Sequence, residues 1–389
     1  ILDTGREGFD APTATVSADI VILAAGTLGT NEILLRSKAA GLPLSDRLGH
    51  NFSGNGDVLG FAYNNDVDIN MVGFGARDPK HQDPVGPTIT TAIDLREQPN
   101  LEDGMIIEEG GVCGPLATFL PRTLSLAAKI AGQDTDQGLS DTIREKTREL
   151  DSLIRGAYTG AVRNSQVYLV MAHDDSTGKL VLEGDRLQIK WPGAGKRPYV
   201  KTVNEKLLQA TKPLGGTFVE NPAWSKLQSQ NMVSAHPLGG AIMADDAAQG
   251  VTNHKGQVFA ANAGTAVYDG LYVNDGAIIP RSLGTNPHIT ICAVAERNMR
   301  LLAQDRGWTI DYNFAPVTQP LELGVSTATP GIQFTEAMEG YFSTKVKDDF
   351  ATGARQGKAD ASSLRMIVTV SSADVEKMMT DPDHAGTIV

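Results

Sequence analysis

The chain has 389 residues, of which 41% are hydrophobic and 21% charged, a composition typical of globular proteins with roughly two to three domains. The formal net charge of -12 argues against nucleic acid as a partner, because phosphate binding requires a basic surface. No run approaches the roughly 18–20 apolar residues that a helix needs to span a bilayer.

The first recognisable unit is the stretch ADIVILAAGTLGTNEILLRSKAAG. Its apolar run Ile20–Ala25 predicts a short strand that is buried on both faces. Gly26 ends this run, and the residues TNEILLRS then open a helix. Strand, glycine turn and helix in this order form half of a parallel α/β unit. Few comparable strands occur nearby, which indicates that the sheet partners of this strand lie outside the chain.

The middle of the chain, from about residue 60 to 225, contains shorter alternating runs that predict an antiparallel sheet. SQVYLVMAHDD and KLVLEGDRLQIKW are two such runs, and the turn-rich DSTG joins them. Three other stretches predict helices: LSLAAKIAG, SDTIREKTRELDSLIRGAY and YVKTVNEKLLQATKPLGG. The second of these helices begins with a Ser140–Asp141 cap signal.

After residue 225 the chain returns to α/β character. GLYVNDGAIIP predicts a strand and a turn, and NPHITICAVAERNMRLLAQ predicts a helix with Asn286 at its N-cap and Pro287 at its first position. From residue 311 the sequence, including SLRMIVTVSS, predicts a β-rich extension. The predicted domain boundaries are therefore 1–60, 61–225, 226–310 and 311–389.

Neither end of the chain has the pattern of a natural terminus. The chain begins ILDTGREGFD, without an initiator methionine or a signal-peptide pattern, and ends in GTIV, which is typical of the start of a strand. Both ends therefore read as internal to a longer sequence, and the localisation cannot be predicted from a targeting segment.

Several familiar catalytic and metal-binding motifs are missing from the sequence. It has no G-x-S-x-G elbow, no G-x-x-x-x-G-K-[ST] loop and no H-E-x-x-H zinc helix. GFGARD begins like a dinucleotide-binding motif but lacks the third glycine and the following helix. The seven histidines are not spaced as metal ligands, so no metal site is predicted. Cys113 and Cys292 are the only cysteines, and two free thiols are favoured over a single disulfide.

Three stretches remain as candidates for a functional site. In NMVSAHPLGGAIM, Pro237 biases His236 toward an extended backbone, and two glycines follow; the histidine is either satisfied within a turn or catalytic. In SLGTNPHIT, Asn286 is either an ordinary helix cap or part of a helix N-terminus that binds an anionic group. In VNDGAIIP, Asp275 is consistent with an ordinary Asp-Gly turn.

Taken together, AAGTLGTNEILLRS, AHPLGG and GLYVNDGAIIPRSLGTNPHITICAVAERN resemble the glucose–methanol–choline (GMC) oxidoreductase family, closest to its cholesterol-oxidase-like branch. The order and separation of the three blocks also match. Members of this family are flavoenzymes that oxidise alcohols with FAD. The resemblance implies an α/β plus α+β fold: a partial, Rossmann-like FAD-binding domain, an antiparallel-sheet substrate domain and a β-rich C-terminal extension.

The resemblance also implies three catalytic residues. His236 matches the histidine that lies by the flavin and handles the proton of the substrate hydroxyl. Asn286 matches the asparagine that hydrogen-bonds the substrate oxygen, and Glu108 matches the active-site glutamate that serves as a base. Glu109 points to the opposite face if this stretch is a strand, so only one of the two acids can serve, and we choose Glu108.

The cofactor-binding residues implied by the resemblance share a place beside FAD: Ala25, Gly26, Asn55, Asp275, Gly276, Asn286, Pro287 and His288. Asp275 and Gly276 match a pair at the pyrophosphate and ribitol, and Asn55 matches a residue near the flavin. His288 stands where relatives often have an aromatic or small residue. Its imidazole either alters the chemistry at the flavin edge or packs without effect.

The family's N-terminal G-x-G-x-x-G unit, which holds the ADP half of FAD, is missing from this chain. We therefore expect a partner chain or an N-terminal segment that carries this unit, and we do not expect the chain alone to bind FAD tightly. The implied activity is FAD-dependent oxidation of the CH–OH group of a sterol or another bulky apolar alcohol by hydride transfer to the flavin. The alternatives are a GMC-type dehydrogenase with an acceptor other than oxygen, and a non-catalytic subunit of a split flavoprotein.

Overall fold

A computed structural model gives the fold of the protein and describes residues 17–73, 89–136, 138–184, 186–221, 232–312, 332–341, 343, 345–346, 349–360, 362–372 and 387–388. The chain divides into two compact units, Ile1–Thr309 and Ile310–Val389. Nearly all of the rejected motif GFGARD lies outside the described residues.

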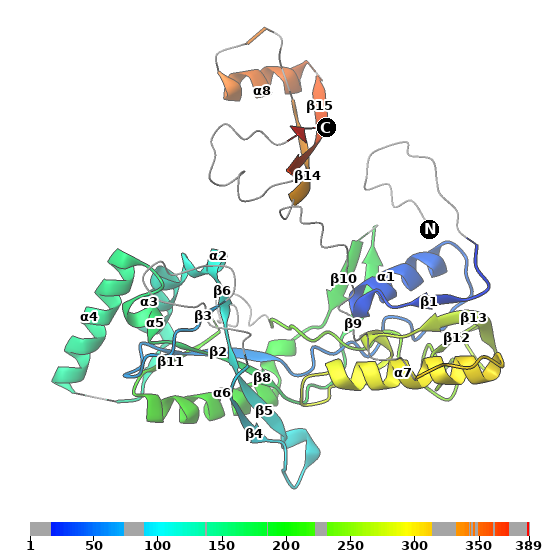
Figure 1. Cartoon of the computed structure of the whole chain (residues 1–389), viewed down its shortest axis with the longest axis horizontal. Helices are drawn as coiled ribbons and strands as arrows, with labels where there is room; N and C mark the ends of the chain where they lie inside the picture. The colour runs from blue at the N-terminus through cyan, green and yellow to red at the C-terminus, as the bar shows by residue number, and fades with distance from the viewer. Residues whose placement is uncertain are drawn as a thin grey trace. The chain divides into compact units, whose positions relative to one another are not determined.

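The first unit contains a small three-stranded sheet whose strand order is β1-β13-β12 (Figure 1). β1 (Val21–Leu23) runs parallel to β13 (Val267–Val273), and β12 (Gln257–Phe259) runs antiparallel to β13. The expectation that the sheet partners of the first strand lie outside the chain is therefore wrong on one side, where β13 pairs with it. Helix α1 (Gly26–Ala39) follows β1 directly, as the strand–glycine–helix pattern predicts. Helix α7 (His288–Asp305) packs its Val294 against the hydrophobic core that this sheet forms with α1, which includes Leu34 and Val273.

The prediction that the first strand is buried on both faces is wrong. Val21 is 44% exposed and Ile22 is 42% exposed. Consecutive residues of a strand point to opposite faces, so neither face of β1 is fully covered by the described residues, and β1 is also an edge strand of its sheet. The apolar run Ile20–Ala25 is longer than the strand, and two of its side chains are partly exposed.

The larger sheet of the first unit is antiparallel, as predicted, and has the order β4-β5-β8-β2-β11-β7. One face packs on helix α6, which buries Val203 and Leu207 against Phe218. The other face packs on helices α3 and α5, where Leu124 and Val162 are buried. The strands are β4 (Ala92–Leu95), β5 (Met105–Gly110), β8 (Gln166–Met171), β2 (Val58–Tyr63), β11 (Thr217–Glu220) and β7 (Gln133–Asp134).

The remaining elements of the first unit surround these two sheets. β9 and β10 form a separate hairpin, and β3 pairs parallel with β6. The bounds of the pairing strands are β3 (Val72–Gly73), β6 (Val112–Cys113), β9 (Lys179–Glu183) and β10 (Arg186–Lys190). The helices are α2 (Gly114–Ala117), α3 (Leu120–Ala131), α4 (Leu139–Arg155), α5 (Gly160–Arg163) and α6 (Pro198–Thr211), with short 3-10 turns η1 (Leu101–Asp103), η2 (Ala194–Lys196), η3 (Lys212–Leu214) and η6 (Gly276–Ile278).

The predicted start of α4 is corrected by the structure. The helix begins at Leu139 with Gly138 in the N-cap position, so Ser140 and Asp141 lie inside its first turn and do not cap it. An acidic side chain in the first turn still interacts favourably with the helix dipole. The side chain of Asp141 pairs with Arg144 one turn further along the helix, at 3.2 Å.

The second unit contains a three-stranded antiparallel sheet and one helix. The strands are β14 (Ile332–Tyr341), β15 (Ser363–Ser372) and β16 (Thr387–Ile388), and the helix is α8 (Phe350–Ala359). The sequence predicts β-rich structure here but does not predict α8. Among the residues that the structure describes in either unit, no helix combines the length and apolar character needed to cross a membrane.

Candidate active site

His236 is held by a buried carboxylate. Its ring Nδ1 lies 3.0 Å from Asp57 Oδ1, and Asp57 is only 2% exposed. Asp57 also accepts the backbone N–H of Ala235 at 2.7 Å and that of His236 itself at 3.1 Å. The hydrogen bond to Asp57 raises the pKa of His236, and the charge of Glu108 acts in the same direction while burial opposes both. His236 is therefore fixed in position and made more basic.

The sequence HPLGG explains how the backbone reaches this position. Leu238 exchanges two backbone hydrogen bonds with Ser53, at 2.9 and 3.0 Å, and this bridge brings the segment beside the loop that carries Asp57. Gly239 follows with φ +84°, a conformation that L side chains rarely adopt, and a Cβ here would overlap the carbonyl oxygen of Asn51. The glycine is therefore required by both the turn and the close approach.

Asn286 and Glu108 contact each other directly. The amide Nδ2 of Asn286 donates to Glu108 Oε2 at 3.1 Å, and Glu108 is only 4% exposed. Glu109, its neighbour on β5, accepts from Thr90 at the surface instead, so the two acids have different surroundings. The structure thus brings Asn286 and Glu108 together across 178 residues of sequence separation.

The prediction that Asn286 is the N-cap of α7 is wrong, because the N-cap is the next residue. Helix α7 begins at His288, and Pro287 occupies the N-cap position with its carbonyl accepting the backbone N–H of Ile291 at 2.9 Å. Asn286 therefore lies just outside the helix. Its side chain makes no cap bond to the N–H groups of the first turn, and its Nδ2 donates to the buried carboxylate of Glu108 instead.

Asn55 holds the loop that precedes Asn286. It is fully buried; its Nδ2 donates to the carbonyl of Thr285 at 2.9 Å, and its Oδ1 accepts the N–H of Leu283 at 2.8 Å. These two bonds fix the backbone immediately before Asn286. The contact of Asn55 with the flavin stays a prediction. In the structure its side-chain amide holds the backbone that leads into Asn286.

The carboxyl ends of the parallel strands β1 and β13 form a second part of the site. Asp275 is 8% exposed and accepts from the N–H of Ala277 at 2.8 Å and from the hydroxyl of Thr30. Gly26 has φ +74° at the start of α1, and no described atom lies within 4 Å of where its Cβ would stand. A helix N-terminus that faces open space at the end of a parallel strand suits an anionic group such as a pyrophosphate.

The two parts of the site are linked through the backbone. The hydroxyl of Thr27, on α1, donates to the carbonyl of Pro237 at 2.6 Å. The N–H of Gly239 donates to the carbonyl of Gly276 at 3.0 Å. The residues predicted to contact cofactor and those predicted to contact substrate thus belong to one connected framework.

A mainly apolar pocket of about 380 Å³ lies next to His236. Ser234 and Pro237, on either side of His236, contribute to its wall. The indole of Trp191 lies edge-on to Phe52, with ring centroids 5.8 Å apart. Further lining residues are Leu28, Gly54, Ile189, Gly193, Ala194, Gly195 and Met232. Its wall offers mainly apolar contact to a ligand.

His288 and Cys292 lie one turn apart on the exposed side of α7. The Nε2 atom of His288 is 3.8 Å from Cys292 Sγ. Cys292 is a free, exposed cysteine, as predicted, whereas the side chain of Cys113 lies outside the described part of the chain. Both alternatives for His288 remain predictions.

Sequence reasoning missed Asp57. The loop NFSGNGD drew attention to Asn55, and the acid two residues later was passed over. An acid that follows an Asn-Gly turn is usually a solvated turn residue. Its pairing with His236 depends on a bridge between segments 179 residues apart, which a sequence pattern does not display.

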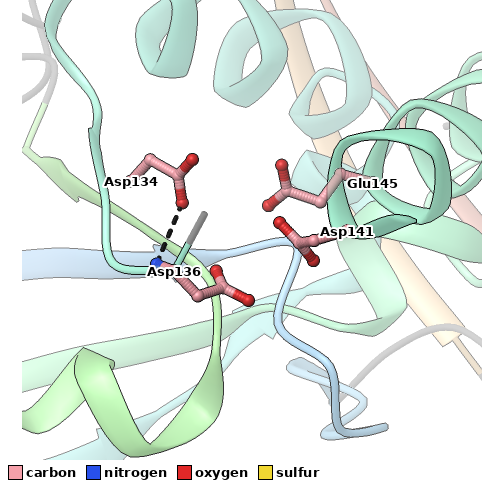
Figure 2. A group of neighbouring side chains, drawn as sticks. All are labelled: Asp134, Asp136, Asp141 and Glu145. Atoms are coloured by element: carbon pink, nitrogen blue, oxygen red, sulfur yellow. Dashed lines mark hydrogen bonds between the residues drawn. The ribbon is translucent and has the colours of Figure 1, made fainter. Parts of the chain in front are cut away.

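Four carboxylates gather away from this site, in the region of α4. Figure 2 shows Asp134, Asp136, Asp141 and Glu145, whose ligand atoms all lie within 4.8 Å of one another. Burial, followed by the charge of Asp141 and those of its acidic neighbours, raises the pKa of Glu145 to about 7. Oxygen ligands of this kind suit a hard cation, but the cluster by itself does not define a metal site.

The raised pKa of Glu145 predicts a pH-dependent stability. Its stabilising effect is present below its ordinary pKa of 4.5 and is lost as the pH rises through about 7, because the carboxylate then ionises among like charges. Since glutamine resembles the protonated acid, Glu145→Gln is expected to raise the free energy of unfolding at pH 8 by about 1 kcal/mol, a value reduced for solvent screening, with little change at pH 4.5. Urea titrations at the two pH values measure this difference.

Glu149, on the same helix, provides a matched control. Despite its burial, hydrogen bonds from Lys129 and Ser125 lower its pKa. Glu149→Gln should therefore lose stability at pH 8, the opposite of Glu145→Gln. Equal effects of the two substitutions would contradict the assignment of repulsion to Glu145.

Comparisons with known proteins show which families and relatives this chain is similar to. Residues 194–295 match the family model for GMC oxidoreductases. The cholesterol oxidase of Mycobacterium tuberculosis is 29% identical over 300 residues, which are 73% of this chain and 46% of the relative. The cholesterol oxidase of Acinetobacter baumannii is 25% identical over 301 residues, which are 72% of this chain and 46% of the relative. The resemblance to the cholesterol-oxidase-like branch of the GMC family is thus confirmed.

Two solved structures are also similar. A FAD-dependent oxidoreductase from Chaetomium thermophilum has a TM-score of 0.41 and 16% identity, and the match covers 78% of this chain and 58% of that one. Pyridoxine 4-oxidase from Mesorbium loti has a TM-score of 0.42 and 18% identity, with 75% of this chain and 52% of that one covered. The chain spans about half the length of the curated relatives that it matches, at 46% of each.

Proposed function

We propose that the protein is an FAD-dependent oxidoreductase that oxidises the CH–OH group of a sterol or another bulky apolar alcohol. The observation that carries the proposal is the imidazole of His236, which is held by Asp57 and whose pKa is also raised by the charge of Glu108, the buried acid that binds Asn286. The relatives named cholesterol oxidase support an alcohol substrate of this class. The mainly apolar pocket beside His236 supports a bulky apolar body on that alcohol.

The residues of the chain supply the proton chemistry. Oxidation of an alcohol releases the hydroxyl proton, and an imidazole whose pKa is near the working pH is suited to accept it. No residue that the structure describes bonds to Nε2 of His236, so in this proposal that atom faces the substrate hydroxyl. Asn286 keeps a second amide hydrogen after its bond to Glu108, and this hydrogen donates to the substrate oxygen as negative charge develops there.

The open N-terminus of α1 supports FAD as the cofactor. In the proposal, Ala25 and Gly26 at this helix and Asp275 and Gly276 beside it hold the pyrophosphate and ribitol within a Rossmann-like domain. Asn55, Pro287 and His288 then border the flavin. When bound, FAD supplies the acceptor for the hydride of the carbinol carbon.

Exposed apolar surface supports a further chain segment or partner that completes the cofactor domain. The edge strand β1 exposes Val21 and Ile22, and Ile289 at the start of α7 is 79% exposed. The unpaired edge of a strand such as β1 is a ready template for pairing with another strand. We propose that a segment or partner chain carrying G-x-G-x-x-G pairs along β1 and covers this surface.

The proposal is tested by isolating the native protein together with the segment or partner chain that carries G-x-G-x-x-G. We expect the assembly to contain FAD, with its yellow absorbance, and this absorbance to bleach anaerobically when a sterol is added. Oxygen uptake with release of hydrogen peroxide would indicate an oxidase, whereas reoxidation only by a quinone or a redox protein would indicate a dehydrogenase. An assembly that contains no flavin would overturn the proposal in favour of a non-catalytic subunit.

A further inference from the structure

Asp57 makes more contacts with the His236 segment than a turn residue requires. Its Oδ2 accepts three hydrogen bonds: from the hydroxyl of Ser234 at 3.1 Å, from the N–H of Ala235 at 2.7 Å and from the N–H of His236 at 3.1 Å. The ring Nδ1 of His236 lies 3.0 Å from Oδ1 and 3.1 Å from Oδ2, so it faces both oxygens of the carboxylate. The side chain of Asp57 is only 1% exposed, so these bonds are shielded from competing water.

We propose that Asp57 is a positioning residue that fixes the tautomer of His236. A carboxylate can only accept hydrogen bonds, so the Nδ1 that faces it must carry the proton. The neutral imidazole then has its lone pair on Nε2, which is the atom that accepts the substrate proton. This inference rests on the proposed function for its consequence in catalysis, but the tautomer itself is a property of this chain.

The unequal use of the two oxygens predicts the effect of an amide. In Asp57→Asn, the three donors around Oδ2 require the amide oxygen at that position, so the NH₂ group replaces Oδ1, which is the nearer of the two oxygens to Nδ1 of His236, at 3.0 against 3.1 Å. An NH₂ group donates, so it is expected to make Nδ1 the acceptor and to move the proton to Nε2. The substitution keeps shape and volume but reverses the tautomer, and Nε2 can no longer accept a proton.

The charges that face His236 predict the pH dependence. Asp57 and, more weakly, Glu108 favour the imidazolium form against the effect of burial. Below the raised pKa, Nε2 carries a proton and cannot act as a base, so flavin reduction is expected to rise with pH through this pKa. Loss of the Asp57 charge lowers the pKa, so the acidic limb of the rate profile should move to lower pH while the plateau falls about 100-fold to 10,000-fold.

Selective ¹⁵N-histidine NMR of the flavin-loaded assembly tests the inference. We expect neutral His236 to carry its proton on Nδ1 in the wild type and on Nε2 in Asp57→Asn. Asp174→Asn is the matched control, since Asp174 is a buried acid that accepts from Gly54 and Gly56 of the same loop without touching His236. This control should leave the His236 tautomer unchanged, even where it loosens the loop.

Two results would overturn the inference: a wild-type His236 protonated on Nε2, or the same tautomer in wild type and Asp57→Asn. The wild-type spectrum decides the question even where the variant does not fold. Because the tautomer is read without turnover, its failure is distinguishable from failure of the proposed function. The proposed function fails, and the inference about Asp57 stands, when the wild-type assembly has the expected tautomer but no alcohol reduces its flavin.

Discussion

Replacing His236 with alanine in the flavin-loaded assembly is expected to lower turnover on an alcohol by about 100-fold to 10,000-fold, with the flavin still bound. The loss removes the proton acceptor, while the proposed cofactor contacts of Gly26 and Asp275 lie on other segments. Stopped-flow measurement of flavin reduction isolates this step, and the flavin content of the purified variant reports cofactor binding. The loss should fall on kcat rather than on KM, because the imidazole acts mainly in the transition state.

His254→Ala is a suitable control for this experiment. His254 is exposed in the loop before β12, and only its backbone carbonyl is engaged, by Arg297. The control should keep both its flavin and its rate of flavin reduction. Unchanged turnover in His236→Ala would contradict the proposed mechanism, and loss of flavin would instead assign His236 to cofactor binding.

The residues that the sequence identified are those whose chemistry is local. His236 directly precedes a proline and, shortly after it, two glycines, and Asn286 precedes a proline at a helix start, so local patterns single out both residues. The family resemblance then relates these separate motifs to one flavin. The structure adds the contact of Asn286 with Glu108, which no local pattern encodes.

What could not be predicted depends on contacts between distant segments. Asp57 reaches His236 only because Ser53 and Leu238 form a bridge. The predicted cap was also wrong at a position with a distant partner: Asn286 lies just before the helix, and its Nδ2 donates to a buried carboxylate from β5. Tertiary partners thus override local propensity at the positions where the site is assembled.

The exposed strand β1 shows a second limit of the sequence. An apolar run predicts burial, but burial also requires a covering element. Val21 and Ile22 have the composition of a buried strand and remain open in the described part of the chain. The composition of β1 alone therefore does not predict burial, because it does not show whether another element covers the strand.

Gly239→Ala is expected to destabilise the first unit by about 3–5 kcal/mol. Two costs combine at this position: the residue has φ +84°, and a Cβ would overlap the carbonyl oxygen of Asn51, which is backbone and cannot rotate away. Chemical denaturation followed by far-UV circular dichroism measures the change.

Gly264 separates the two costs, because it has φ +81° but no atom within 4 Å of its would-be Cβ. Gly264→Ala should therefore lose only about 1 kcal/mol, the cost of the left-handed backbone alone. Equal losses at the two sites would mean that the chain after His236 is not packed against Asn51. A larger loss at Gly239 means that the segments approach so closely that position 239 has no room for a Cβ. The same close approach brings Asp57 to His236.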